Sequence, residues 1–206
     1  MGLKLNATNG GGSVELDVPD TVNDDVVLTL PNNDGLPDHV LATDGSGVLR
    51  WVDSITEVDQ WYLTASHSTN DTLVDWARNN FDGAAANIGF GMSVASGVFT
   101  FPRNGKWLVV LTCNFTIAGD DSVSGFIQVT ENDGTNWVTV AKIAEGNGGT
   151  NSRNGGSTNF YFLDVTDWTE VKVRFQASSL DSGSQITGDN SDFMRTNALF
   201  IRMGST

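Results

Sequence analysis

Hydrophobic and polar residues alternate along much of the chain, which is the pattern of strands with one buried face. The clearest example runs from Trp107 to Ile117. One face of this predicted strand carries Trp107, Val109, Leu111, Cys113, Phe115 and Ile117. The other face starts with Leu108 and Val110 and turns polar at Thr112, which predicts burial on both sides at the start of the strand.

Shorter runs of the same kind predict a strand-rich domain from about residue 58 to the end of the chain. Strands are expected at residues 60–64, 97–102, 126–130, 137–141, 159–163, 170–175 and 198–203. An Asp-Gly pair within residues 132–136 is typical of a hairpin. About eight short strands separated by turns predict an antiparallel sandwich or jelly roll. Two exceptions are expected, a helical turn at residues 70–77 and a Gly/Asn-rich loop at 145–157.

The first 53 residues are rich in Gly, Asn and Asp and contain only short β-like runs. These runs lie at residues 13–19, 26–31, 40–42 and 48–51. Strands this short are marginal by themselves, so they need a partner. We therefore expect residues 1–53 to be a β-rich attachment region and residues 54–206 to form a separate domain. The candidate attachment or assembly residues are Val14, Leu16, Val18, Val27, Leu28, Leu30 and Trp51.

Composition agrees with an all-β fold and narrows the function classes. The 206 residues include 23 glycines and four prolines, and 39% are hydrophobic against 17% charged. Helix surfaces normally use many Lys, Glu and Arg residues, which are scarce here. The formal net charge is −14, which repels phosphate backbones and anionic lipids. We expect no nucleic acid partner and no membrane insertion. Because no apolar run has signal-peptide length, we also expect synthesis in a cytoplasm.

Candidate catalytic chemistry is sparse, and the expected function is not enzymatic. Cys113, the only cysteine, lies on an apolar strand and is expected to be a small buried hydrophobe. His39 and His67 are expected to be solvated loop residues without the oriented partner that a general base needs.

No cofactor is expected, although carboxylates in Asp-rich turns suit calcium. The candidate calcium ligands are Asp120, Asp121 and Asp133, for which solvated turn residues are the favoured interpretation.

The six tryptophans are expected to have different environments. Trp107 fits the core, and Trp61 and Trp76 are expected to cover it. Trp137 and Trp168 lie near predicted loop ends, where an aromatic side chain contacts either a glycan or a neighbouring protomer.

Three segments of the domain resemble complement globular-head and tumour-necrosis-factor-like (TNF-like) jelly rolls. The run Phe99–Trp107 resembles the aromatic, Pro, turn, Gly, aromatic entry to their central strand. The stretch Leu163–Val173 is similar to a later Leu, loop, Asp, Val passage, although Asp167–Glu170 replaces the usual Gly-Asp pair. Residues 198–202 resemble the last buried strand. The resemblance covers about residues 85–204 and implies a homotrimer.

The N-terminal region resembles segments of tailed-bacteriophage fibres and head-decoration proteins. The likeness is carried by residues 13–19, 28–31 and 40–51, with a Thr-Asp-Gly-Ser-Gly turn at 43–47. It implies a structural virion surface protein, a trimeric knob that decorates or stabilises a capsid and contacts other virion proteins such as the major capsid protein. The open alternative is a tail-fibre or receptor-binding tip that recognises a host surface glycan.

Overall fold

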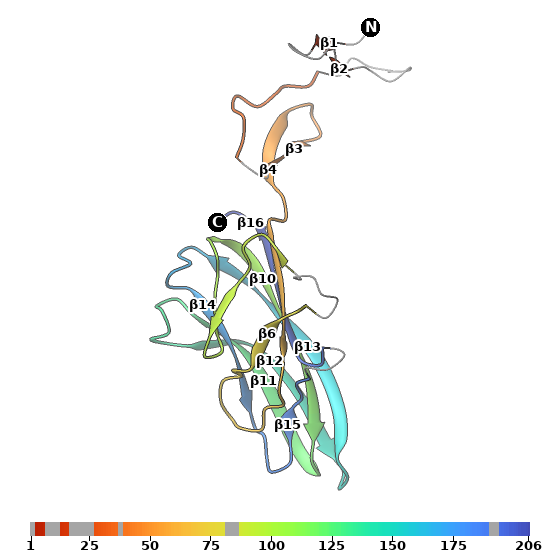
Figure 1. Cartoon of the computed structure of the whole chain (residues 1–206), viewed down its shortest axis with the longest axis vertical. Helices are drawn as coiled ribbons and strands as arrows, with labels where there is room; N and C mark the ends of the chain where they lie inside the picture. The colour runs from red at the N-terminus through yellow and green to blue at the C-terminus, as the bar shows by residue number, and fades with distance from the viewer. Residues whose placement is uncertain (1–2, 7–12, 17–26, 37–38, 81–86, 190–193) are drawn as a thin grey trace. The chain divides into compact units, whose positions relative to one another are not determined.

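The computed structural model describes residues 3–6, 13–16, 27–36, 39–80, 87–189 and 194–206 (Figure 1). Within these ranges every regular element is a β-strand. In this part of the chain there is also no helix with the length and apolarity needed to cross a membrane. The chain divides into two compact units, Met1–Val52 and Asp53–Thr206.

The smaller unit contains two short hairpin-like sheets. Strand β1 (Leu3–Asn6) pairs antiparallel with β2 (Ser13–Leu16), and β3 (His39–Thr43) pairs with β4 (Leu49–Asp53). The turn between β3 and β4 is built on Asp44, whose Oδ1 accepts the backbone N–H of Ser46 at 2.7 Å. The strands expected at residues 40–42 and 48–51 are therefore confirmed.

The strand expected at residues 26–31 is wrong for the part that is described. Only an isolated bridge between Thr29 and Val48 occurs there. Residues 17–26, which hold the end of the first predicted run and the start of this one, lie outside the described residues.

The larger unit is a sandwich of two antiparallel sheets. The seven-stranded sheet has the order β13-β10-β16-β5-β6, with β15 beside β10 and β7 beside β5. Its strands are β5 (Glu57–Leu63), β6 (Trp76–Arg78), β7 (Asn87–Ile88), β10 (Gly105–Ile117), β13 (Arg153–Val165), β15 (Gln185–Ile186) and β16 (Asn197–Gly204). The five-stranded sheet has the order β12-β11-β14-β9-β8. Its strands are β8 (Ser93–Ala95), β9 (Val98–Thr100), β11 (Asp120–Thr130), β12 (Val138–Gly148) and β14 (Lys172–Ser178).

The core lies between the inner faces of the two sheets, and β10 supplies one side of it. Its six inward residues, from Trp107 to Ile117, are at most 1% exposed, as the alternation predicts. Aromatic rings from both sheets meet there, with Phe99 of β9 in contact with Phe200 of β16 at a centroid distance of 5.0 Å. The outward residues Leu108 and Val110 are half-buried rather than buried, so the expectation of burial on both sides is wrong for this chain alone.

The helical turn expected at residues 70–77 is absent. The segment is extended, and the backbone N–H of Leu73 donates to the carbonyl of Phe175 at 2.9 Å. Leu73 and Trp76 are both buried in the core, and Trp76 begins β6. Burial of these two side chains therefore overrides the local capping signal.

The long loop expected at residues 145–157 is also wrong. Strand β12 continues to Gly148, and β13 already starts at Arg153. Arg153 stabilises this strand end, because its Nη1 donates to the carbonyl of Gly146 at 2.8 Å and its Nη2 contacts Glu145. Strand pairing therefore includes most of this Gly- and Asn-rich segment, although such a composition is typical of loops.

Candidate functional site, an assembly surface

The outer face of the seven-stranded sheet carries two cross-strand rows of apolar side chains. The first row runs through Phe162, Leu108, Ile201, Val58 and Ile88, on β13, β10, β16, β5 and β7. The second row contains Phe160, Val110 and Leu199 and ends at Gln60. The exposed fractions are 53% for Phe162, 63% for Phe160 and 55% for Ile88. We call these eight hydrophobic residues the apolar face.

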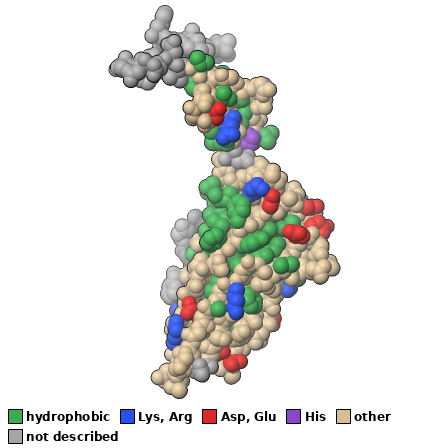
Figure 2. All heavy atoms as spheres, turned by 180° about the vertical axis from the view of Figure 1, so that it is seen from behind, with side chains coloured by type: hydrophobic (Ala, Val, Ile, Leu, Met, Phe, Trp, Pro, Cys, Tyr) green, Lys and Arg blue, Asp and Glu red, His purple; other side chains and the backbone are tan. Residues whose placement is uncertain are grey.

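Polar pairs border the apolar face along the strands. On one side, Lys106 Nζ of β10 lies 2.8 Å from Asp164 Oδ2 of β13. On the other side, the hydroxyls of Thr112 and Thr158 lie 2.9 Å apart. An uncharged apolar centre with a polar margin is the anatomy of a protein interface. In the view of Figure 2, hydrophobic side chains gather in several patches on the larger unit.

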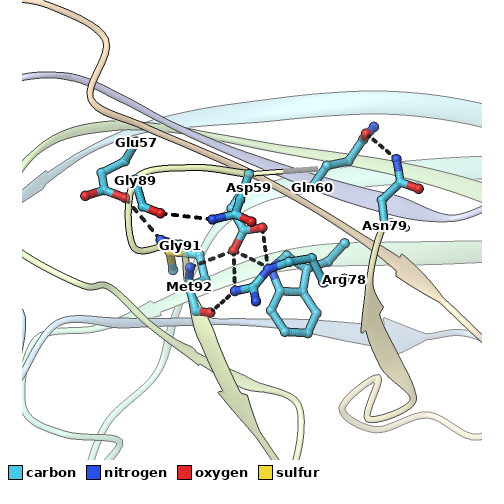
Figure 3. Close-up of polar contacts among 10 residues, drawn as sticks. Glu57, Asp59, Gln60, Arg78, Asn79, Gly89, Gly91 and Met92 are labelled. Atoms are coloured by element: carbon cyan, nitrogen blue, oxygen red, sulfur yellow. Dashed lines mark hydrogen bonds and ion pairs between the residues drawn. The ribbon is translucent and has the colours of Figure 1, made fainter. Parts of the chain in front are cut away.

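Buried carboxylates on β5 hold the segment that brings Ile88 to this face (Figure 3). Asp59 is 1% exposed and accepts four hydrogen bonds. Two come from Arg78, with Nε to Oδ1 at 2.9 Å and Nη2 to Oδ2 at 3.0 Å. The others come from the Met92 backbone N–H at 2.6 Å and the indole of Trp61 at 2.8 Å. The carboxylate therefore ties β5, β6 and the segment after β7 together.

Glu57 makes a second anchor on the same strand. Its Oε2 accepts the backbone N–H of Gly91 at 3.1 Å, and its Oε1 lies 2.8 Å from Arg103 Nη2. The Arg103 guanidinium also lies 5.2 Å from the ring centroid of Phe90. Gly89 has a φ of +75°, and a Cβ there would lie 2.3 Å from the Thr56 carbonyl, so only glycine fits. These contacts fix Ile88 and the exposed Phe90 beside β5.

Sequence reasoning missed this carboxylate network. The predicted strand began at Gln60, although Glu57, Asp59, Trp61 and Leu63 are in the same phase and all point inward. The alternation was therefore a usable signal. Acidic residues are rarely buried without a partner, so the sequence by itself favours an exposed turn at Glu57 and Asp59. Only the pairing with Arg103 and Arg78 explains their burial.

The structure leaves the predicted attachment residues of the smaller unit largely exposed. Val27, Leu28 and Leu30 are 73%, 59% and 71% exposed. Trp51 is half-buried beside Gly35 and donates its indole N–H to the carbonyl of Asn33 at 3.0 Å. It lines a hollow of ≈ 620 Å³ within this unit.

For three further attachment residues the structure describes no side chain. Val14 and Leu16 lie in β2, of which the structure describes the backbone pairing. Val18 lies outside the described residues.

The two candidate contact tryptophans do not belong to the two apolar rows. Trp168 is 44% exposed in the turn before β14, and its backbone N–H donates to Asn104 Oδ1 at 2.8 Å. Trp137 is half-buried just before β12, with the Arg174 guanidinium 4.3 Å from its ring centroid. Trp107, Trp61 and Trp76 are buried, as predicted.

The candidate nucleophile and bases are placed as follows. Cys113 is fully buried, and this desolvation raises the pKa of its thiol. The His39 ring lies 3.2 Å from the backbone N–H of Leu36. The prediction of a solvated His67 is wrong, because its side chain is 11% exposed and its Nε2 lies 2.6 Å from Asp71. Its backbone bridge to Ile186 pulls the residue against the seven-stranded sheet.

Two of the candidate calcium ligands lie in a strand and not in a turn. Asp120 and Asp121 begin β11, and Asp121 accepts hydrogen bonds from the Ser184 hydroxyl and the Ser122 backbone. Asp133 does lie in a turn and pairs with Lys172. Among the described residues, no cluster of three or more His, Cys, Asp and Glu is arranged to hold a metal. The expectation of no cofactor, with calcium as the less favoured interpretation of these carboxylates, stays a prediction.

No protein-family model matches the chain, and no curated protein matches its sequence. Solved structures do match its fold. Eiger TNF from S. frugiperda aligns with a TM-score of 0.53 and 11% identity, over 72% of this chain and 93% of that one. Murine APRIL aligns with a TM-score of 0.49 and 12% identity, over 71% and 98% of the two chains. With its two antiparallel sheets and a likeness to Eiger TNF, the chain is an all-β protein with a TNF-like jelly roll.

Proposed function

We propose that the chain is a non-enzymatic structural protein that forms a homotrimer through the apolar face. The observation that carries the proposal is the pair of apolar rows across five strands, bordered by the Lys106–Asp164 and Thr112–Thr158 pairs. Contiguous apolar surface of this kind marks an interaction site. The threefold number is what the resemblance to TNF-like jelly rolls implies.

A second copy of the same chain is the favoured occupant. The chain carries a net charge of −14, so two copies repel each other except where they meet through uncharged surface. The apolar rows contain no charged side chain, and the one charged pair beside them is internally neutralised. Contact through this face therefore removes hydrophobic area from water without burying an unpaired charge.

A threefold ring needs two different patches that fit each other. The proposed second patch is the sandwich edge where β12 lies beside β13, joined by the Asn159 Nδ2 to Lys142 carbonyl hydrogen bond of 3.0 Å. Val138 is 63% exposed there, and it lines a hollow of ≈ 290 Å³ together with Tyr161 and Leu163. Phe160 and Phe162 of β13 connect this edge with the apolar face.

Native mass spectrometry with one substitution tests this assembly. The 22.0 kDa chain should give a species of three chains, about 66 kDa. Phe162→Asp should return it to 22.0 kDa, because a charge would be buried in each contact. Val74→Asp is the matched control, since Val74 is 47% exposed outside the apolar face, and it should stay trimeric. A stable wild-type monomer at micromolar concentration would overturn the proposal.

We further propose that the trimer lies on the surface of a phage particle and is attached by the smaller unit. The support is the resemblance of residues 40–51 to phage proteins, a segment in which β3 and β4 flank the turn at Asp44, and the exposure of Val27, Leu28 and Leu30. Head decoration, with the major capsid protein as partner, is the first candidate. A receptor-binding tip that recognises a host glycan is the alternative, favoured by the exposure of Trp168.

A further inference from the structure

The positive charges of the larger unit are unevenly partnered. Six of its nine Lys and Arg residues, all in the described ranges, contact a carboxylate: Arg78, Arg103, Lys106, Arg153, Lys172 and Arg195. Arg202 is buried, and its guanidinium donates to the Asn104 carbonyl and the Thr56 hydroxyl. Lys142 and Arg174 remain as surface cations that contact no carboxylate among the residues that the structure describes. In a chain with 25 acidic residues, this absence distinguishes them from the other cations.

Both of these cations lie on the outer face of the five-stranded sheet. Arg174 alternates with the buried Val173 and Phe175 of β14, and Lys142 precedes the buried Ile143 of β12. Strand β11 lies between them. Its outward residues Gln128 and Phe126, two positions apart, pair in register with Arg174 and Lys142 respectively. Such positions are about 7 Å apart, so the two cations belong to adjacent rows of one surface.

Each cation is combined with an aromatic ring. The Arg174 guanidinium lies 4.3 Å from the Trp137 ring centroid, and the Lys142 ammonium lies 5.8 Å from that of Phe126. Arg174 is also oriented by Gln128, whose Oε1 accepts from its Nε at 2.7 Å. Gln128 in turn donates to the Thr139 hydroxyl at 3.1 Å. The guanidinium plane is therefore fixed, while its two terminal nitrogens donate to no acceptor in the described part of the chain.

We propose that this surface binds an acidic polysaccharide whose sugars carry carboxylates. The fixed guanidinium of Arg174 offers the paired N–H donors that match a carboxylate, and Lys142 offers a second charge one row away. Sugar rings pack against the aromatic side chains, and the amides of Gln128 and Gln176 provide hydrogen bonds for hydroxyls. This surface is on the sheet opposite the apolar face, although β12 also borders the proposed second patch of the trimer. The inference adds a ligand site to the proposed assembly.

Partial desolvation supports an anionic ligand. Burial lowers the pKa of Arg174, although the group stays charged at neutral pH because the ordinary pKa of a guanidinium lies far above 7. A partly desolvated cation without a counterion gains more from an incoming carboxylate than a solvated one does. A polyphosphate offers oxygens to the same donors, so a single-stranded oligonucleotide is the competing ligand in the experiment below.

Isothermal titration calorimetry on the full-length protein tests the proposal with oligogalacturonate, its methyl ester and a single-stranded oligonucleotide. Oligogalacturonate should bind, and the uncharged ester should bind at least tenfold more weakly. Arg174→Ala and Lys142→Ala should each weaken oligogalacturonate binding about tenfold or more. Arg195→Ala, which removes a cation that is paired with Asp189 before β16, should leave the affinity unchanged.

Three results would overturn the proposal: equal binding of acid and ester, tighter binding of the oligonucleotide, or affinity unaffected by both Arg174→Ala and Lys142→Ala. If Arg174→Ala fails to fold, as judged by circular dichroism, Lys142→Ala and Arg174→Lys decide. Native mass measured on the same samples separates this outcome from a failure of the trimer proposal.

Discussion

The Cys113 side chain of β10 packs against Gly125 of β11 in the core. A Cβ at Gly125 would lie 2.8 Å from the Cys113 sulfur, so the thiol occupies the space that a larger residue would need. The thiol therefore fills space in the core and has no contact with solvent. Its ionisation is coupled to folding, because the sulfur must become solvated before it loses its proton.

We expect Cys113 to make the protein less stable at alkaline pH. Its folded-state pKa is raised above the ordinary value of 9.0, so its contribution is complete below that pH and declines as pH rises further. The free energy of unfolding should fall by about 1.4 kcal/mol per pH unit above 9 through this group. Urea unfolding of the wild type and Cys113→Ala between pH 7 and 10 measures this slope. Parallel curves for the two proteins would contradict the assignment.

The burial of single residues was well predicted where apolar residues occupy every second position of a strand. The inward set of β10, with Cys113 in its middle, follows from a period of two. His67 and the carboxylates of β5 were not predicted. Their environment depends on partners distant in sequence, such as Arg78, which lies 19 positions after Asp59. A pattern within one strand does not contain that information.

At the scale of elements, Asp59 joins three segments of the seven-stranded sheet. Arg78 is the last residue of β6. It reaches Asp59 because β6 pairs with β5 in a register that places Arg78 opposite Trp61. The same carboxylate then holds the Met92 backbone. Edge strands as short as β6 and β7 gain most of their order from such contacts, because they make few ladder hydrogen bonds.

Asp59→Ala should destabilise the larger unit by about 3 kcal/mol, because it removes the carboxylate partner of the half-buried Arg78 and leaves two buried N–H donors, those of Met92 and Trp61, without an acceptor. Urea unfolding measures the loss. Asp164→Ala removes the partner of Lys106 at the surface and should cost less than about 1 kcal/mol. Hydrogen exchange of the Met92 amide should accelerate in the first variant only. An equal effect of both substitutions would mean that the buried network is unimportant.

Element types were predicted better than element ends. The hairpin at Asn132–Asn136 and the closing strand at residues 198–203 were confirmed because turn chemistry and alternation agree there. The helix at 70–77 and the loop at 145–157 were wrong because tertiary burial and backbone pairing override local composition. The apolar face could be inferred only in part. The sequence shows that Leu108 and Val110 are apolar residues on the outer face of their strand. Their alignment with Phe162 and Ile201 depends on how β10 pairs with β13 and β16, which the sequence does not give.

At the scale of the whole molecule, the two units are proposed to have separate tasks. The larger unit has its own core and both of the proposed surfaces. The smaller unit carries exposed apolar residues that the larger one does not need for its sandwich. Folding and trimer formation should therefore be independent of attachment.

Removal of residues 1–52 should leave a folded trimer that no longer binds particles. Circular dichroism and native mass would report the fold and assembly, and co-sedimentation with purified particles would report attachment. Immunogold labelling of the intact protein at head lattice positions supports decoration, whereas labelling at the tail alone supports the receptor-binding tip. Unfolding of the truncated chain would show that the units are not independent.

Strand β16 has a consequence for the order of biosynthesis. It lies between β10 and β5 in the seven-stranded sheet, yet it is translated after every other strand of the larger unit. Until β16 leaves the ribosome, β5 lacks its main neighbour, and β10 has only the two residues of β15 on its side opposite β13. The nascent domain thus exposes two long unpaired strand edges, which are templates for aggregation. Slow, non-local closure of this kind makes the yield of folded protein sensitive to temperature and expression rate.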